Sequence, residues 1–274
     1  MRGPPRVADP GRTSEGIPRQ DSIKLRDRIG TDGYNTIMNQ CLGTGSAYYC
    51  GLIKRDPANG SLWLTPNGYI VNPIYNAGRL ETSGVDFAAS YGRNILGAKT
   101  SLSFQGSLLL HNRTEVTLHN SDGSIGSNGL YDCKGFYGDN CGVPNPTWRH
   151  RLRLTVAPTA QYALSFGWRY IGPTNIDAAN QDLDASGSPL IGYGQPVSDF
   201  KFSRIPAYNY FDVSLNFYPT EKFKWTIGVN NIADKDPAIV PGADLGAGNN
   251  NGNTYPGYYD QLGRTFFTGV TLNF

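Results

Sequence analysis

Hydrophobic and polar residues alternate one by one through several segments of the chain, a pattern that predicts β-strands with one apolar face. The clearest case is segment 147–157. One set of positions holds Trp148, His150, Leu152, Leu154 and Val156, and the set between them holds Arg149, Arg151, Arg153 and Thr155. Because successive side chains of a strand point to opposite faces, this strand would be apolar on one side and cationic on the other.

Six more segments follow the same rule, and each predicts a strand: 85–91, 101–110, 162–171, 211–218, 223–230 and 266–274. Segment 22–30 fits the pattern over a shorter stretch and is expected to be the remains of one further strand. The chain would then hold about seven or eight strands and no long helix.

The links between these strands alternate in length. Short turns are expected near 93–98, 158–161 and 219–222, and long polar links near 112–146, 173–206 and 235–257. An up-and-down antiparallel meander produces this when one rim of a barrel carries tight turns and the other carries large loops. Outer-membrane barrels have this asymmetry, so the predicted fold class is all-β, an antiparallel transmembrane β-barrel present as a partial barrel.

Composition agrees with strands and turns, since 34 Gly, 17 Tyr and 12 Phe accompany only 2 Met. The charge is nearly balanced, with 24 Lys and Arg against 22 Asp and Glu, so a nucleic-acid partner is not expected. Aromatic residues gather at the ends of the predicted strands, as in the girdles of membrane barrels. A soluble β-sandwich also alternates, however, with its apolar face buried against a second sheet.

The first 21 residues are rich in Pro, Gly and Arg and predict a disordered or non-native segment, residues 1–21. They contain no apolar core of a secretory signal. An outer-membrane location is therefore expected for this chain as part of a longer precursor.

Four cysteines lie in two local pairs, Cys41 with Cys50 and Cys133 with Cys141. Neither spacing fits the short Cys–Cys gaps of zinc sites. Two short-loop disulfides, Cys41–Cys50 and Cys133–Cys141, are one interpretation and would require an oxidising compartment such as the periplasm. Four free thiols in loops are the other interpretation.

Several motifs resemble those of one protein family. They are Gly228–Pro237 (GVNNIADKDP), Tyr258–Phe267 (YYDQLGRTFF) followed by Thr268–Phe274, Asn76–Asp86 (NAGRLETSGVD), and the cysteine-bearing Tyr131–Cys141. In this order they resemble the barrel of TonB-dependent outer-membrane receptors. The resemblance covers roughly residues 22–274, which would be the C-terminal portion of such a barrel.

The resemblance implies active uptake of a scarce nutrient by a receptor of about 22 strands whose lumen holds a plug. Implied partners are the TonB complex, outer-membrane lipid and the barrel-assembly machinery, for which the terminal Phe274 resembles the recognition signal. The small-molecule ligand would be an iron–siderophore complex, or in some members vitamin B12, a carbohydrate or a peptide. The plug, the TonB-contacting segment and the early strands are missing from this sequence, so a fragment inactive by itself is expected.

Arg149, Arg151, Arg153 and Arg169 are expected to face the lumen. They would contact an anionic ligand or the plug, or they would only be solvated and form salt bridges to neighbouring strands. No catalytic triad, phosphate-binding loop or metal-ligand spacing is evident, so no enzyme, cofactor or metal site is predicted.

Two other functions remain open at this point. A complete small barrel of eight strands would have a structural or adhesive role, although its interior would have to be filled by side chains that here are mostly small or polar. A soluble β-sandwich would bind carbohydrate.

Overall fold

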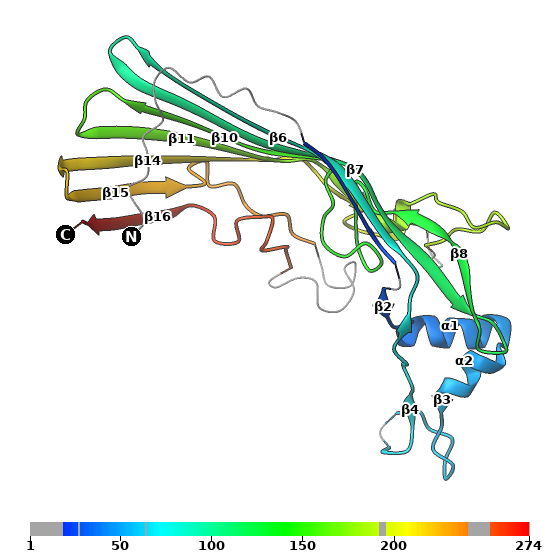
Figure 1. Cartoon of the computed structure of the whole chain (residues 1–274). Helices are drawn as coiled ribbons and strands as arrows, with labels where there is room; N and C mark the ends of the chain where they lie inside the picture. Colours follow the sequence, from blue (N-terminus) through cyan, green and yellow to red (C-terminus); the bar gives the residue numbers. More distant parts are fainter. Residues whose placement is uncertain (1–18, 27, 64, 192–195, 241–252, 274) are drawn as a thin grey trace.

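The structure is a computed structural model that describes residues 19–26, 28–63, 65–191, 196–240 and 253–273. One large antiparallel sheet dominates it (Figure 1). Its strands are β1 (Arg19–Leu25), β6 (Leu80–Ile95), β7 (Ala98–His119), β8 (Ile125–Asp132), β10 (Trp148–Ala157), β11 (Tyr162–Ile171), β14 (Tyr208–Thr220), β15 (Phe223–Asn230) and β16 (Thr265–Leu272).

The strand order is β1-β6-β7-β10-β11-β14-β15-β16, with β8 paired to the far half of β7. Apart from β8 and from short strands in the long links, the strands of this order follow one another in the chain, as in a meander. The sheet does not close, because β1 and β16 are its two edges within the described part of the chain. The predicted partial antiparallel barrel is confirmed, and a closed eight-stranded barrel is not what these strands form.

The register keeps like side chains on one face. Leu152 of β10 pairs with Phe104 of β7 and with Trp168 of β11, and Arg151 beside it pairs with Gln105 and Arg169. We call the side that carries Arg149, Arg151, Arg153 and Arg169 the arginine face. The opposite side is the aromatic face, and its large side chains include Phe104, Trp148, Phe166, Trp168, Phe211, Trp225 and Phe266.

Within the described part of the chain, no second layer covers the aromatic face. Leu164, Trp225 and Val270 are 51%, 44% and 59% exposed. In a sandwich these positions would be buried under a facing sheet. The soluble sandwich therefore does not describe this chain.

The links alternate in length as the sequence predicts. Short turns join β6 to β7, β10 to β11 and β14 to β15, and long segments join β1 to β6, β7 to β10, β11 to β14 and β15 to β16. All long segments consequently leave the sheet at one rim, which we call the long-loop rim. None of the described helices is long and apolar enough to cross a membrane.

The longest of these segments was not predicted to have structure of its own. This insert (28–63 and 65–79) contains α1 (Tyr34–Thr44) and α2 (Ala47–Leu52), joined by the Cys41–Cys50 disulfide. Four short strands accompany the helices: β2 (Ile29–Gly30), β3 (Ile53–Lys54), β4 (Tyr69–Ile70) and β5 (Tyr75–Asn76). Figure 1 shows the insert beyond the long-loop rim, next to the tip of β7.

Several strands differ from their predicted bounds. β1 begins at Arg19, so residues 19–21 of the segment predicted to be disordered pair with β6, and β1 ends at Leu25. Pairing with a neighbouring strand orders these residues, and no local pattern signals it. Residues 1–18 lie outside the described part.

β7 extends to His119 instead of ending near residue 110. A bulge opposite Ser83 and Gly84 leaves Leu110 out of the register, and this breaks the alternation. Beyond the bulge β7 pairs with β8, which the sequence analysis places in a long polar link.

The remaining long segments pack together into a core of their own. β9 (Phe136–Tyr137), β12 (Thr174–Ile176) and β13 (Arg204–Ile205) form a three-stranded sheet, with two short 3-10 turns, η1 (Asp177–Ala179) and η2 (Val197–Asp199), nearby in the chain. The core is rich in tyrosine, with fully or almost fully buried Tyr137, Tyr208, Tyr210, Tyr255 and Tyr259. Loops from three different links therefore form one packed unit above the sheet.

Candidate ligand-binding site on the arginine face

Three arginines stand in a row on β10, at Arg149, Arg151 and Arg153. Their side chains are exposed, and no carboxylate lies within ion-pair distance of any of them in the described part of the chain. Alternate residues of a strand are about 7 Å apart, so the three guanidinium groups form a ladder along the sheet. The ladder runs from the long-loop rim toward the middle of the strand.

The β7 neighbours of this ladder are neutral, whereas on β11 Arg169 lies beside Arg151. The register partners of the three arginines on β7 are Ser107, Gln105 and Ser103. Arg153 also donates a hydrogen bond of 3.3 Å to Ser165 of β11. Hydroxyl and amide groups hydrogen-bond without cancelling charge, so the ladder keeps its positive charge.

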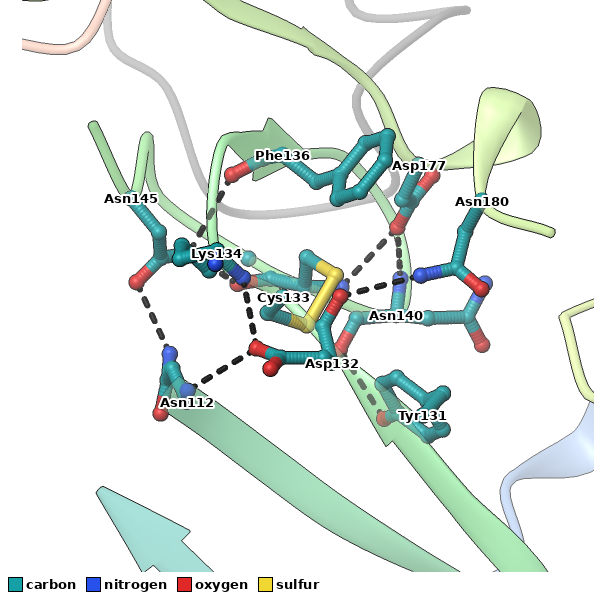
Figure 2. Close-up of a disulfide and its surroundings, with 12 residues drawn as sticks. Asn112, Tyr131, Asp132, Cys133, Lys134, Phe136, Asn140, Asn145, Asp177 and Asn180 are labelled. Carbon is teal, nitrogen blue, oxygen red and sulfur yellow. Dashed lines mark hydrogen bonds between the residues drawn. A yellow bond between two sulfur atoms is a disulfide. The ribbon is translucent and has the colours of Figure 1, made fainter. Parts of the chain in front are cut away.

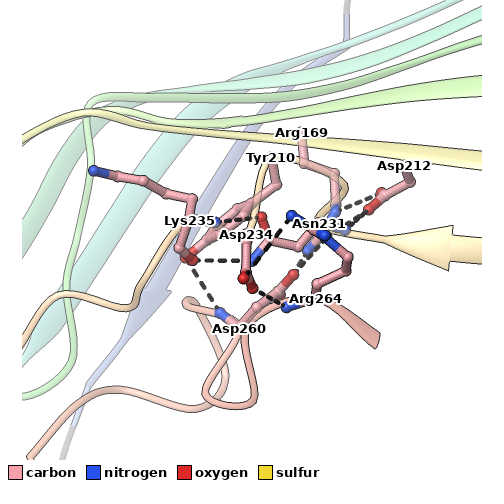
Figure 3. A network of polar contacts seen from close by, with 8 residues as sticks. All are labelled: Arg169, Tyr210, Asp212, Asn231, Asp234, Lys235, Asp260 and Arg264. Atoms are coloured by element: carbon pink, nitrogen blue, oxygen red, sulfur yellow. Dashed lines mark hydrogen bonds and ion pairs between the residues drawn. The ribbon is translucent and has the colours of Figure 1, made fainter. Parts of the chain in front are cut away.

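Arg169 differs from the ladder because it is neutralised twice. Its guanidinium group donates to both carboxylate oxygens of Asp212, at 2.8 and 2.9 Å, and to both of Asp260, at 2.8 and 2.7 Å. The ring of Tyr210 lies 4.9 Å from the guanidinium carbon. We call Arg169, Asp212 and Asp260 the loop clamp, because Asp260 belongs to the link between β15 and β16 (Figure 3).

The loop clamp explains two motifs found in the sequence. The backbone N–H of Asn231, which follows β15, donates to Asp212 at 2.9 Å. The Asn231 side chain in turn holds the backbone of Lys235, and Asp234 accepts the backbone N–H of Arg264 at 2.8 Å. The segment after β15 and the segment before β16 are thus fastened to each other and to the wall (Figure 3).

Several hollows lie on the arginine face, and two of them are each lined by two arginines of the ladder. One has a volume of about 660 Å³ and is lined by Arg151, Arg153 and Lys224 of the wall and by Asp260 of the link. The other has a volume of about 490 Å³, with Arg149, Arg151 and Tyr258 in its lining. Both hollows are therefore lined by members of the ladder that have no acidic partner.

The second disulfide, Cys133–Cys141, closes a small loop above the wall (Figure 2). The backbone N–H groups of Asn140 and Cys141 donate to one oxygen of Asp177, at 2.8 and 2.9 Å. Asp177 is completely buried and lies in η1, at the start of the link between β11 and β14. The disulfide loop therefore fastens one long link to another.

Removing this disulfide should loosen the loop unit. For the double variant Cys133→Ser/Cys141→Ser, chain-entropy reasoning on a loop of this size gives a loss of about 2.5 kcal/mol. Thermal unfolding followed by loop proteolysis would show earlier cleavage within 133–141. The matched control, Cys41→Ser/Cys50→Ser, should loosen only the insert, and equal loosening of 133–141 in both variants would contradict the local role.

The structure places the predicted site residues in different situations. Arg149, Arg151 and Arg153 have no acidic partner among the described residues, whereas Arg169 forms salt bridges to neighbouring segments. The cysteines form the two disulfides of the expected pairs. The predicted assembly signal Phe274 lies outside the described residues. Sequence reasoning missed Asp212 and Asp260, although Asp260 stands inside the quoted Tyr258–Phe267 motif.

No group of three or more His, Cys, Asp or Glu side chains in the described residues is arranged to hold a metal ion.

An open antiparallel meander with tight turns at one rim and long packed loops at the other is the wall of an outer-membrane type of β-barrel. A family model described as "TonB dependent receptor-like, beta-barrel" matches residues 22–232, well over half of the chain. The chain belongs to the family of TonB-dependent receptors, which are transport receptors and not enzymes. No curated protein matches the sequence.

Several solved structures are similar to the chain at low sequence identity. A mutant ferric enterobactin receptor (PfeA) from Pseudomonas aeruginosa, in complex with enterobactin, is 15% identical, with a TM-score of 0.50, 94% of this chain covered and 29% of that chain. The siderophore receptor PirA from Acinetobacter baumannii is 14% identical, with a TM-score of 0.48 and coverages of 94% and 29%. The outer membrane transporter YddB from Escherichia coli is 12% identical, with a TM-score of 0.46 and coverages of 96% and 31%. The chain thus spans less than a third of the length of these proteins.

Proposed function

We propose that residues 22–274 form part of the barrel wall of an outer-membrane receptor that takes up an anionic nutrient, such as an iron–siderophore complex, with energy supplied through TonB. The observation that carries the proposal is the ladder of Arg149, Arg151 and Arg153. Three exposed guanidinium groups that have no acidic partner among the described residues line hollows of one face.

The chemistry of the ladder fits such a ligand. Chelators that bind ferric iron through three doubly deprotonated catechol groups give complexes with a net negative charge. Arginine presents a rigid fork of N–H donors that matches paired oxygens, and its charge persists at any physiological pH. Neutral neighbours on β7 add hydrogen bonds while leaving the attraction for an anion intact.

The aromatic face supports a location in the outer membrane. It exposes large apolar side chains over the whole sheet, and soluble proteins rarely expose apolar area on that scale. Outer-membrane lipid would cover this face, with strand-end aromatic residues at the headgroup level. The barrel-assembly machinery is the expected partner for insertion, through a C-terminal signal that includes Phe274.

Uptake by whole cells tests the proposal. The protein that contains this chain would be produced with an export signal in a host that lacks ferric siderophore receptors. We expect uptake of radioactive iron from ferric enterobactin, and its loss when the host lacks TonB. Absence of uptake, or uptake that is equal without TonB, would count against the proposal.

A variant tests the ladder itself. Arg149→Gln/Arg151→Gln/Arg153→Gln removes three positive charges but keeps hydrogen-bonding groups, so the sheet should remain intact. Each charged hydrogen bond contributes roughly 1.5–3 kcal/mol, and we expect ligand affinity to fall by at least about a hundredfold. Binding would be measured by ligand titration of the purified receptor in detergent.

The matched control for that variant is Arg93→Gln, since Arg93 lies near the short-turn end of β6 and away from both hollows. Its affinity should match that of the unchanged protein. If the triple variant and the control bound the ligand equally well, the three arginines would not be part of the ligand site.

A further inference from the structure

One histidine joins the insert to the tip of β7. The His119 side chain is only 4% exposed, and its Nδ1 lies 3.3 Å from Oδ2 of Asp32, which is 2% exposed. His119 is the last residue of β7, whereas Asp32 precedes α1 in the insert. A buried pair of ionisable side chains thus connects two segments that are far apart in the sequence.

Three tyrosines of the insert surround the imidazole ring. Tyr48 stacks on it at 4.2 Å between ring centroids, and Tyr75 and Tyr49 meet it edge to face at 4.5 and 6.1 Å. The hydroxyl of Tyr49 also accepts the backbone N–H of His119 at 3.0 Å. Aromatic faces attract a cation, so together with the Asp32 carboxylate they form a socket suited to a positively charged ring.

The socket gives its carboxylate few hydrogen-bond donors. The Tyr75 hydroxyl donates to Oδ1 of Asp32. Burial and this bond to Asp32 raise the pKa of Tyr75, so that the phenol keeps its proton and remains a donor. Within the described atoms, Oδ2 of Asp32 and Nδ1 of His119 have no hydrogen-bond partner and face each other. A buried carboxylate in this position depends on a counter-charge.

Other charged groups near the tip are engaged elsewhere. Glu115 of β7 accepts the backbone N–H of Arg79 at 2.9 Å, and its carboxylate lies 4.0 Å from the guanidinium group of Arg79. Asp122, in the turn after β7, accepts hydrogen bonds from Ser124. Among the described residues, His119 is the one ionisable base within ion-pair distance of Asp32.

We propose that His119 and Asp32 form a pH-sensitive latch that holds the insert on the tip of β7 while the imidazole is protonated. Docking brings the Asp32 carboxylate and the tyrosine rings to the imidazole ring, and they attract it as a cation only while it is protonated. Docking is therefore strong at low pH and weakens as pH rises through the range of 5 to 8 in which histidine changes its charge. The latch would control the position of the insert at the long-loop rim, independently of any ligand.

Hydrogen exchange of the full chain in detergent tests the latch. Amide protection would be read in α1 and α2 at pH 5.5 and pH 8, with labelling times corrected for the pH dependence of intrinsic exchange. We expect corrected protection of α1 and α2 to be about tenfold greater at pH 5.5, where the ion pair can form, than at pH 8. The unchanged protein alone can contradict the latch: if its corrected protection is the same at both pH values, the proposal is overturned.

Two variants and one control test whether His119 and Asp32 cause the pH dependence. His119→Gln and Asp32→Asn should each make protection in α1 and α2 independent of pH, and pH dependence that persists in both would overturn the proposal. The matched control is His111→Gln, because His111 lies on the same strand and faces Asp132 at 3.2 Å but is 45% exposed. Water screens that pair, so the control should keep the pH dependence of the unchanged protein.

Discussion

Replacing Arg169 by methionine is expected to detach the link between β15 and β16 from the arginine face. The substitution keeps most of the side-chain volume but leaves Asp212 and Asp260 facing each other without a cation. All three side chains are about one-quarter exposed or less, at 22% for the arginine and 24% for each carboxylate. Breaking such a pair costs about 3 kcal/mol, the lower end of the range for buried pairs because water partly reaches this one.

Proteolysis of the full chain in detergent would measure the release of the loop. Cleavage within 253–264 should become much faster in the Arg169→Met variant, while cleavage at the short turns stays unchanged. Arg153→Met is the matched control, since Arg153 is on the same face and has only a hydrogen bond to Ser165. The triple variant Arg169→Met/Asp212→Asn/Asp260→Asn should regain part of the protection, and no regain would mean that charge is not the cause.

The sheet could be predicted from the sequence because its faces meet different surroundings. One face is apolar and the other polar from β10 to β16, and this contrast imposes a period of two on every strand. The register pairs of Leu152 and Arg151 repeat that contrast across three strands. Where the contrast ends, beyond the bulge near Leu110, the period disappears and the prediction of β7 stops too early.

The insert and the loop clamp could not be predicted in the same way. α1 and α2 are short, and tertiary contacts with the tip of β7 stabilise them together with their disulfide. The partners of Arg169 come from β14 and from a link about ninety residues later in the chain, a separation of 91 for Asp260. Alternation indicates which face a side chain occupies, but it carries no information on which loop folds back over that face.

For the four arginines, the sequence predicts the face on which each side chain lies but not its ionic partners. Spacing alone places Arg149, Arg151, Arg153 and Arg169 on one face, and the structure agrees. Only the folded chain separates them by charge balance, with Arg169 neutralised by two carboxylates and the other three without an acidic partner among the described residues. Proximity of acidic loops, which is a property of the tertiary structure, decides which arginines remain available for an anion.

Replacing Gly138 by alanine is expected to open the loop that the Cys133–Cys141 disulfide closes. A Cβ atom at this position would lie 2.2 Å from Oδ1 and 2.6 Å from Cγ of Asp177. The φ angle of +141° is also one that residues with a side chain rarely adopt. Since Asp177 is completely buried and holds two backbone N–H groups of the loop, it has no room to move aside.

We therefore expect a loss of roughly 3 to 5 kcal/mol from the steric clash and the backbone strain together. Hydrogen exchange would detect this loss as reduced protection of the Asn140 and Cys141 amides, which donate hydrogen bonds to Asp177 in the unchanged protein. Gly142→Ala is the matched control: its φ is +67°, but no atom lies within 4 Å of the added carbon. That variant should lose only about 1 kcal/mol through strain. If both variants lost the same protection, backbone strain alone would account for the effect, and the close approach to Asp177 would not be what holds the two links together.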